Sequence, residues 1–189
     1  MPITPLHVAY VWPFRLKLKK LSFAALTLGA LAPDLENPIL YLMGFYPWRL
    51  ATHSFLGTFT VDLLIVVALG KFLSRLRVER FGLNGFMSLR IDSWFLFSAF
   101  LGSLSHILID WMHHSYNPLF WPFEPFYVAG LLLSTLSRPF SDLLINLVSA
   151  LILIFTLKSI LNRQGQGLLL IFRQPFKAIS LITDSLSRC

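Results

Sequence analysis

The segment His106–His114, HILIDWMHH, places three histidines and one aspartate within a strongly apolar stretch of the chain. His106 and Asp110 are four residues apart, so in a helix their side chains lie one turn apart on the same face. An imidazole nitrogen and a carboxylate oxygen at this spacing can bind one divalent ion. His113 and His114 follow closely enough for at least one of them to continue the same face. The alternative interpretation is that these side chains hydrogen-bond neighbouring helices to one another.

The other ionisable residues of the apolar stretches extend this set. His7 lies in TPLHVA, Asp34 in GALAPDLENP and His53 in ATHSFLG, which together with the first segment accounts for every histidine of the chain. A charged group at the centre of a membrane helix costs about 2.5–3.5 kcal/mol on insertion scales, so a function with a specific partner is its first explanation.

Composition indicates that a lipid bilayer surrounds these residues. Of the 189 residues, 56% are hydrophobic and 13% are charged, which is far more apolar than an ordinary soluble domain. A membrane-spanning helix needs about 20 mostly apolar residues. We therefore predict an all-α, polytopic membrane helix bundle of about four spans, at residues 21–44, 52–72, 93–112 and 139–157. The apolar tract 125–136 is too short to cross, and we expect it to be re-entrant or interfacial.

Basic residues predict how the bundle is oriented. They gather before the first span, between the second and third spans and after the fourth, whereas the opposite loops hold only Arg49 and Arg138. By the positive-inside rule, the basic segments and the C-terminus are cytoplasmic. The formal net charge of +7 then reflects topology, and we expect no nucleic-acid partner. Residues 1–162 are predicted to form one membrane-embedded unit. Residues 163–189 form a cytoplasmic tail, either an amphipathic helix broken or kinked at Pro175 or a loosely ordered segment.

Antiparallel connections bring the candidate ligands to a similar depth. A chain reversal between Lys20 and Leu21 places His7 opposite Asp34, and a reversal near residues 79–80 places His53 opposite His106. Both pairs then lie in the outer half of the membrane. This arrangement requires residues 3–14 to form a partial helix that enters the bilayer from one side.

Two prolines, Pro33 and Pro38, predict a break in the first span, because proline is unfavourable inside a helix. Broken helices occur in membranes where the backbone lines a protein-enclosed or wet cavity, and Asp34 would bind an ion there. In the alternative interpretation the helix is only kinked, and Asp34 caps its second half. Glu36 is interpreted as a polar loop residue. Asp62 lies half a helical revolution away from the metal-facing side of its span and is excluded from the metal group.

Taken in order, the motifs TPLHVA, LAPDLE, THSFLG and GSLSHILIDWMHH, followed by NPLFWPF, resemble those of inner-membrane metal-dependent hydrolases, a family that includes the LexA-regulated bacterial members. The resemblance covers residues 1–125, and that family is itself similar to zinc-dependent phospholipase C and the related zinc nucleases. The resemblance implies that one zinc ion is surrounded by Asp34, His53, His106 and Asp110. It also implies that Asp110 bridges to a second ion held partly by His7. The HxxxE motif of a third zinc site is absent, and only His113, His114 and Glu124 are available as substitutes.

This resemblance makes hydrolysis of a phosphoester the leading functional prediction. Paired metal ions activate water and neutralise the charge that builds on a phosphoryl group. We expect Zn²⁺, or alternatively Mn²⁺, as one or two ions, with Asp110 as ligand and bridge and Asp34 as ligand or base. A site in the outer half of the bilayer suggests a lipid or lipid-linked phosphoester as substrate. Its head group would meet the outward loop 115–125, which carries Asn117 and Glu124.

Two functions of other classes fit the same residues. Intramembrane histidines and aspartates also mark ion paths, so the bundle could transport a divalent cation. A continuous polar track to the cytoplasmic side would favour transport, but the sequence offers only Asp62 and a few hydroxyl groups there. Alternatively, the metal could clamp the helices without catalysis, in which case its ligand shell would be closed.

Overall fold

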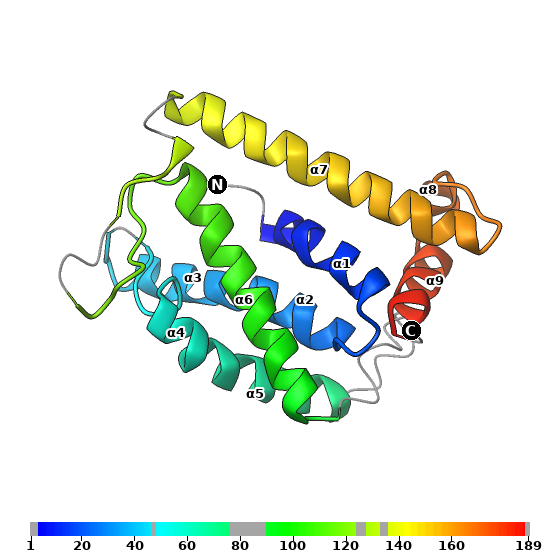
Figure 1. Cartoon of the computed structure of the whole chain (residues 1–189), viewed down its shortest axis with the longest axis horizontal. Coiled ribbons are helices and arrows are strands. Elements are labelled where there is room, and N and C mark those ends of the chain that lie inside the picture. Colours follow the sequence, from blue (N-terminus) through cyan, green and yellow to red (C-terminus); the bar gives the residue numbers. More distant parts are fainter. Residues whose placement is uncertain (1–3, 47, 76–89, 124–127, 133–135, 188–189) are drawn as a thin grey trace.

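The computed structural model describes residues 4–46, 48–75, 90–123, 128–132 and 136–187. Within these ranges the chain is helical, and its one β feature is an isolated bridge between Asn117 and Val128 (Figure 1). The elements are η1 (Thr4–His7), α1 (Val8–Lys17), α2 (Phe23–Leu31), η2 (Pro33–Leu35), α3 (Glu36–Leu42), α4 (Phe55–Phe59), α5 (Val61–Arg75), α6 (Ser93–His113), α7 (Arg138–Arg163), α8 (Leu170–Arg173) and α9 (Pro175–Ser187).

Three helical segments are long and apolar enough to cross a membrane. They are Phe55–Arg75, which combines α4 and α5, Ser93–His113, which is α6, and Arg138–Arg163, which is α7. At about 1.5 Å per residue, a helix of this length matches a hydrocarbon core of about 30 Å. The predicted all-α membrane bundle is confirmed, and these segments correspond to its second, third and fourth predicted spans.

The first predicted span is divided into three pieces. α2 ends at Leu31, the short η2 begins at Pro33, and α3 continues to Leu42. Pro33 has no backbone N–H to donate to the preceding turn, so the α-helix stops before it, as the sequence predicts. The described residues therefore contain three helical segments of spanning length and a further segment that is broken at Pro33, with Asp34 in the break.

α2 is the central helix of the bundle, because every residue from Phe23 to Ala30 is buried. Its principal neighbour is α6, and it also packs against α1 and α5. Glycine and alanine let α2 and α6 approach closely: a Cβ on Gly102 would lie 2.4 Å from the carbonyl oxygen of Leu26, and one on Gly29 would lie 2.2 Å from that of Ala99. Small residues at such crossings are typical of membrane helix pairs.

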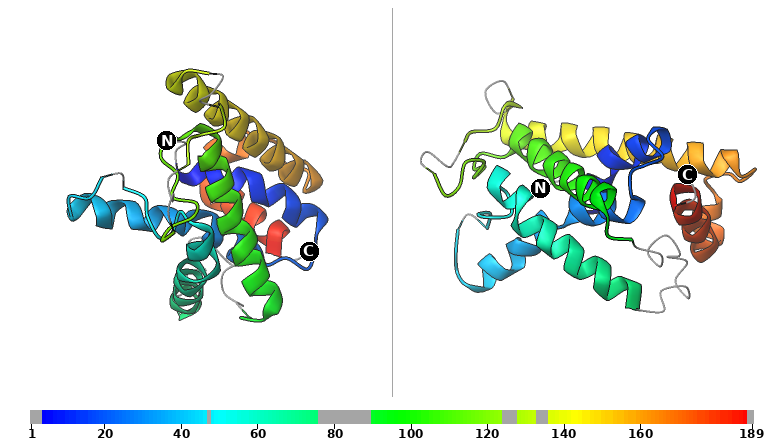
Figure 2. Two further views of the ribbon diagram at one scale, coloured as in Figure 1. Left: turned by 60° about the vertical axis from the view of Figure 1, so that its left-hand side comes forward. Right: turned by 60° about the horizontal axis from the view of Figure 1, so that its bottom comes forward.

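The N-terminal helices lie inside the fold. α1 packs between α2 and α7, as the views in Figures 1 and 2 show. Val8 and Val11 form a buried apolar cluster with Leu21 and Leu26. The predicted partial helix at residues 3–14 thus corresponds to η1 and α1, within the described residues that begin at Thr4.

The C-terminal tail folds back on the bundle. α8 ends at Arg173 and α9 begins at Pro175, so the proline separates two helices, which is the break that its sequence position predicts. Ile182 and Leu186 of α9 join the main apolar core. Gln164, directly after α7, donates a hydrogen bond of 2.9 Å from its side-chain amide to the Leu181 carbonyl. The division at residue 162 into bundle and tail stays a prediction.

The segment after α6 turns back on the end of that helix. The Val128 amide donates to the Asn117 carbonyl at 2.8 Å, and the Leu131 amide donates to the Trp111 carbonyl at 3.1 Å. Residues 128–132 of the predicted re-entrant tract contain no α-helix. The rest of that tract includes 125–127 and 133–135, which lie outside the described residues, as does Glu124.

Candidate metal centre

His106 is the centre of the candidate site. It lies on α6 with no exposed surface, and its Nδ1 is 2.8 Å from the carbonyl oxygen of Ala30 on α2. A carbonyl can only accept, so Nδ1 carries the proton and donates, which leaves a lone pair on Nε2. This is the usual second contact of a metal-binding histidine. The close α2–α6 packing therefore fixes both the orientation and the tautomer of His106.

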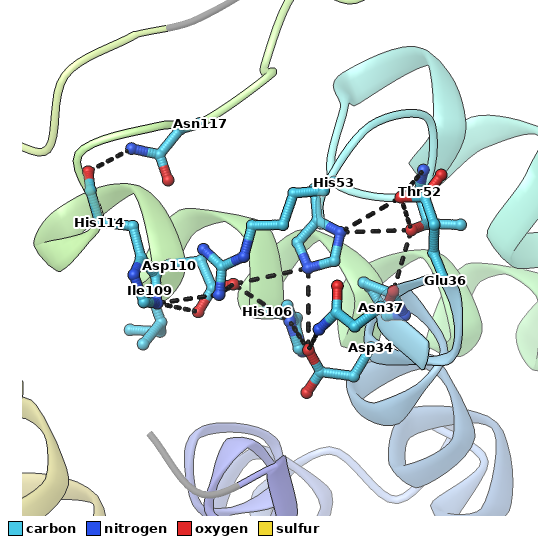
Figure 3. Close-up of polar contacts among 12 residues, drawn as sticks. Asp34, Glu36, Asn37, Thr52, His53, His106, Ile109, Asp110, His114 and Asn117 are labelled. Carbon is cyan, nitrogen blue, oxygen red and sulfur yellow. Dashed lines mark hydrogen bonds and ion pairs between the residues drawn. The ribbon is translucent and has the colours of Figure 1, made fainter. Parts of the chain in front are cut away.

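Four side chains from three parts of the chain, namely η2, the segment before α4, and α6, converge around one point (Figure 3). His106 Nε2 lies 3.6 Å from Asp34 Oδ1 and 3.4 Å from Asp110 Oδ2. His53 Nε2 lies 3.8 Å from Asp34 Oδ1 and 3.6 Å from Asp110 Oδ2. Ligands held about 2.0–2.1 Å from a tetrahedral ion are about 3.3–3.4 Å from one another, so the observed spacing is close to that of a tetrahedral shell.

Several atoms of these side chains lack other partners. Nε2 of His53, Nε2 of His106 and Oδ1 of Asp110 are buried without a hydrogen-bond partner in the described structure. Oδ2 of Asp110 has an arginine nitrogen, Nη2 of Arg49, 2.9 Å away. Buried polar atoms are almost always hydrogen-bonded, because an unsatisfied one costs about 1–3 kcal/mol. Two imidazole nitrogens and two carboxylate oxygens form a donor set that suits Zn²⁺ and similar divalent ions. The residues present therefore fit a metal ion.

Asp110 also faces a second pair of histidines. Its Oδ1 lies 3.7 Å from His7 Nε2 and 3.6 Å from His114 Nε2, while its Oδ2 faces His53 and His106. The His7 ring stacks on the His106 ring with centroids 3.8 Å apart. The structure thus brings together all five predicted ligands and His114, which the sequence offered as an additional candidate. The carboxylate of Asp110 lies between two groups of imidazoles.

Arg49 is a member of this cluster that the sequence did not single out. Only 6% of its surface is exposed, and its Nη2 lies 2.9 Å from Asp110 Oδ2 and 2.9 Å from His114 Nε2. Burial, followed by the nearby Arg49 charge, lowers the pKa of His114 to about 2. The His114 ring is therefore neutral at physiological pH, and its Nε2 accepts the hydrogen bond from Arg49.

Comparison with known proteins agrees with this membrane fold. A family model described as YdjM inner membrane protein matches residues 4–174. The chain belongs to this family. No curated protein and no solved structure matches the chain. Membership of the YdjM family and the apolar helices place the protein in the inner membrane, which confirms that part of the predicted localisation. The orientation of the termini and of the site stays a prediction. The family description states a location and no activity.

Glu36 has a structural role in this YdjM-family chain that the sequence did not suggest. Its carboxylate accepts hydrogen bonds from the backbone amides of Leu50, Ala51 and Thr52 at 2.9, 3.0 and 3.3 Å, and lies 2.7 Å from the Thr52 hydroxyl. Its Oε2 is also 3.6 Å from Nδ1 of His53. Glu36 therefore holds the loop that carries Arg49 and His53 against α3. The sequence interpretation of Glu36 as a polar loop residue did not predict this role.

Replacing Glu36 by glutamine is expected to lower zinc affinity about tenfold or more, because residues that orient metal ligands typically contribute 10–100-fold. It should also destabilise the protein by about 2 kcal/mol, since the amide group of glutamine would face backbone N–H donors. Zinc titration and thermal unfolding in detergent would measure both effects. Asp92→Asn is the matched control, because Asp92 caps α6 at Phe95 far along the chain from the site and asparagine caps equally well. Equal zinc affinity in the two variants would contradict this role.

The remaining predicted residues lie around the cluster. His113 donates from Nδ1 to the Ile109 carbonyl at 2.8 Å, and its Nε2 lies 3.7 Å from Asp142 Oδ1 on α7. A ring nitrogen of His113 also lies within 4.8 Å of possible ligand atoms of Asp110 and His114. Asn117 donates to the carbonyls of His114 and Val128 at 2.6 and 3.0 Å, so it shapes the loop. Asp62 is outside the metal group, as predicted, and pairs with the Ser103 hydroxyl of α6.

Proposed function

We propose that this protein is a membrane-embedded, metal-dependent hydrolase that cleaves a phosphoester of a lipid or lipid-linked substrate. The observation that carries the proposal is the buried convergence of Asp34, His53, His106 and Asp110. Of their inward-facing atoms, Nε2 of His53 and Nε2 of His106 have no hydrogen-bond partner in the described structure. Helix-clamping hydrogen bonds would instead pair these atoms directly, at 2.7–3.2 Å.

The residues that would hold the metal are these four, and Asp110 would also reach a second ion held partly by His7. When bound, Zn²⁺ or Mn²⁺ supplies Lewis acidity, which activates water and neutralises charge developing on a phosphoryl group. The protein's own contribution is to fix the ligands: the Ala30 carbonyl orients His106, and Asn37 donates a hydrogen bond of 2.8 Å to Asp34 Oδ1.

Asp34 is the residue best placed to handle a proton. It lies in the break between α2 and α3 and is more exposed than Asp110, with 9% against 3% of its side chain accessible. It also lines a cavity of about 620 Å³, so a substrate can reach this side of the ligand group. A purely structural metal site would be closed on every side. We therefore assign Asp34 as ligand and general base, and Asp110 as ligand and bridge.

The surroundings of Asp34 favour a lipid as the substrate. The cavity that it lines is otherwise mainly apolar and lies between α1, α2 and α7, with walls that include Val8, Leu31, Leu35 and Leu153. On the other side of the ligand group, Arg49 and His114 line a separate cavity with aromatic and cationic walls. The phosphoester of a lipid lies at the same kind of boundary, between an apolar chain and a polar head group.

The helix ends favour a site near the outer leaflet. His106 and Asp110 lie in the C-terminal half of α6, and His53 lies just before α4. These positions, together with the start of α7, are at the same end of the three spans. The opposite end carries Lys71, Arg75, Arg90 and Arg163. Because basic loops are retained in the cytoplasm, we place that end and the C-terminus inside and the site outside.

The test is hydrolysis of phospholipids and lipid phosphates by the purified protein in detergent micelles. We expect a chelator to reduce phosphate or phosphorylated head-group release by more than about 100-fold, and Zn²⁺ or Mn²⁺ to restore it. Asp34→Asn should keep the fold and lose most of the activity. If metal-loaded wild-type protein hydrolyses no lipid phosphoester, the proposed function is wrong even where the metal is bound.

A further inference from the structure

We propose that the cavity beside Arg49 and Arg138 is an anion site for a phosphate-type head group, and thus that the substrate is a lipid bearing a terminal phosphate. That the bound lipid is the substrate rests on the proposed function, whereas the anion site itself depends only on the geometry of the chain. The cavity has a volume of about 110 Å³, and its lining includes Tyr46, Trp48, Arg49, His114, Tyr116 and Arg138. Since a water molecule occupies about 30 Å³ in the liquid, there is room for a phosphate group.

The charge of this cavity selects anions. Two arginines line it, and no carboxylate is among the described residues of its wall. Asp110 pairs with Arg49 from outside this wall, so the charge of Arg138 is the one left without a carboxylate in the described part of the wall. His114 accepts a hydrogen bond from Arg49, and an imidazole adds no negative charge to the wall. Arginine binds phosphate particularly well, because its planar fork donates two parallel hydrogen bonds to phosphate oxygens. A zwitterionic head group such as phosphocholine would also bring its cation into this positive field.

Arg49 connects the cavity to the metal centre. Its Nη2 is engaged by Asp110 and His114, whereas its Nη1 is buried without a hydrogen-bond partner in the described structure. A guanidinium has five N–H donors, and an unsatisfied buried donor on a charged group is costly. An anion in the adjoining cavity would satisfy such a donor. The same side chain would then touch both the head group and the carboxylate shared by the candidate ions.

The start of α7 adds to the positive field. Arg138 is the first residue of this 26-residue helix, and the side chain of its N-cap residue, Ser137, makes no capping hydrogen bond. A helix N-terminus carries a partial positive charge and free backbone N–H groups, which attract phosphate. Arg138 is exposed, so it can approach a ligand without first giving up a buried contact.

The aromatic wall indicates that the anion belongs to a membrane lipid. Tyr46 packs edge-on against Trp48 and Tyr116, with ring centroids 6.2 and 6.4 Å apart. Tyrosine and tryptophan gather at the level of lipid head groups, where one part of the side chain is apolar and the other is hydrated. The anion cavity therefore lies at head-group depth.

The experiment is calorimetric titration of metal-free protein in neutral detergent, which separates this site from metal binding and from turnover. The probes are short-chain phosphatidic acid, short-chain phosphatidylcholine and inorganic phosphate. We expect phosphatidic acid to bind at least tenfold more tightly than either of the others. Arg138→Gln should weaken its binding about tenfold, while Arg163→Gln, at the opposite end of α7, should leave it unchanged. Arg49→Lys, which keeps the charge but loses the fork, should weaken it to a similar extent.

Equal binding of phosphatidic acid by wild type and Arg138→Gln would overturn the anion site. Inorganic phosphate binding as tightly as phosphatidic acid would overturn the assignment to a lipid head group, and equal binding of phosphatidylcholine would overturn the charge selection. The titration uses metal-free protein, so its result does not depend on the metal centre. If this protein binds phosphatidic acid but the metal-loaded protein hydrolyses no lipid phosphoester, the proposed function is wrong and the anion site is still supported. If the metal-loaded protein hydrolyses a lipid phosphoester but the metal-free protein does not bind phosphatidic acid selectively, the anion site is wrong and the proposed function is still supported.

Discussion

Replacing His106 by alanine is expected to lower zinc affinity by at least about 100-fold, more than the loss of a residue that only orients a ligand. His106 belongs to two of the groups that can hold an ion, one with His7 and Asp110 and one with Asp34 and His53. Its loss would therefore remove a ligand atom from whichever of these groups binds the ion. Elemental analysis of purified protein, followed by a competition titration with a chelator, would measure the effect.

His113→Ala is the matched control for this variant. His113 is also fully buried on α6 and also donates from Nδ1 to a backbone carbonyl, but its Nε2 faces Asp142. The two substitutions remove the same side chain from the same helix, so their general effects on packing should be similar. We expect His113→Ala to keep the zinc bound around Asp34 and His53. Equal zinc affinity of the two variants would refute the central place of His106.

Replacing Gly102 by alanine is expected to destabilise the protein by about 3 kcal/mol, which is at the upper end of the usual cost of overpacking. The added Cβ would lie 2.4 Å from the Leu26 carbonyl oxygen and 2.8 Å from the Ala30 amide nitrogen, and both are backbone atoms of a buried helix. α2 and α6 would have to separate. The Ala30 carbonyl that orients His106 would then move, so zinc affinity should fall together with the unfolding temperature.

Gly167→Ala provides the comparison, because a Cβ at that position would meet no atom within 4 Å and its backbone has no left-handed conformation. Thermal unfolding in detergent, read by circular dichroism, should show a large decrease for Gly102→Ala and little change for Gly167→Ala. A Gly102→Ala variant as stable as the wild type would mean that α2 and α6 are not packed as closely as the structure shows.

Much of the ligand set followed from the sequence because two kinds of information agreed. Helical spacing placed His106 and Asp110 on one face, and antiparallel register placed His53 opposite His106, where the structure has the two rings 5.4 Å apart. Register fixes depth only to about one turn, however, and says little about side-chain direction. His7 was thus brought to the correct depth opposite Asp34, whereas its Nε2 faces Asp110 and its ring stacks on His106.

The residues that support the ligands were harder to predict. Arg49 and Glu36 act across the loop between α3 and α4, and such contacts depend on tertiary structure that no periodic pattern reports. Topology rules count a loop arginine only as a charge, so Arg49 was assigned to an outward-facing loop with no further role. In the structure its side chain is buried. Hydropathy has a similar limit, because lipid-facing and protein-facing helices are equally apolar. It therefore gave no sign that α2 is enclosed by other helices.

X-ray absorption spectroscopy of zinc-loaded wild-type protein in detergent tests the metal centre most directly. We expect at least about one ion per chain, with nitrogen and oxygen neighbours at about 2.0–2.1 Å and the outer-shell signal of coordinated imidazole. His106→Ala, loaded in the same way, should lose the imidazole signal in proportion to its lost zinc. A folded wild-type protein that binds no stoichiometric zinc or manganese, or an ion surrounded only by water oxygens, would contradict the account.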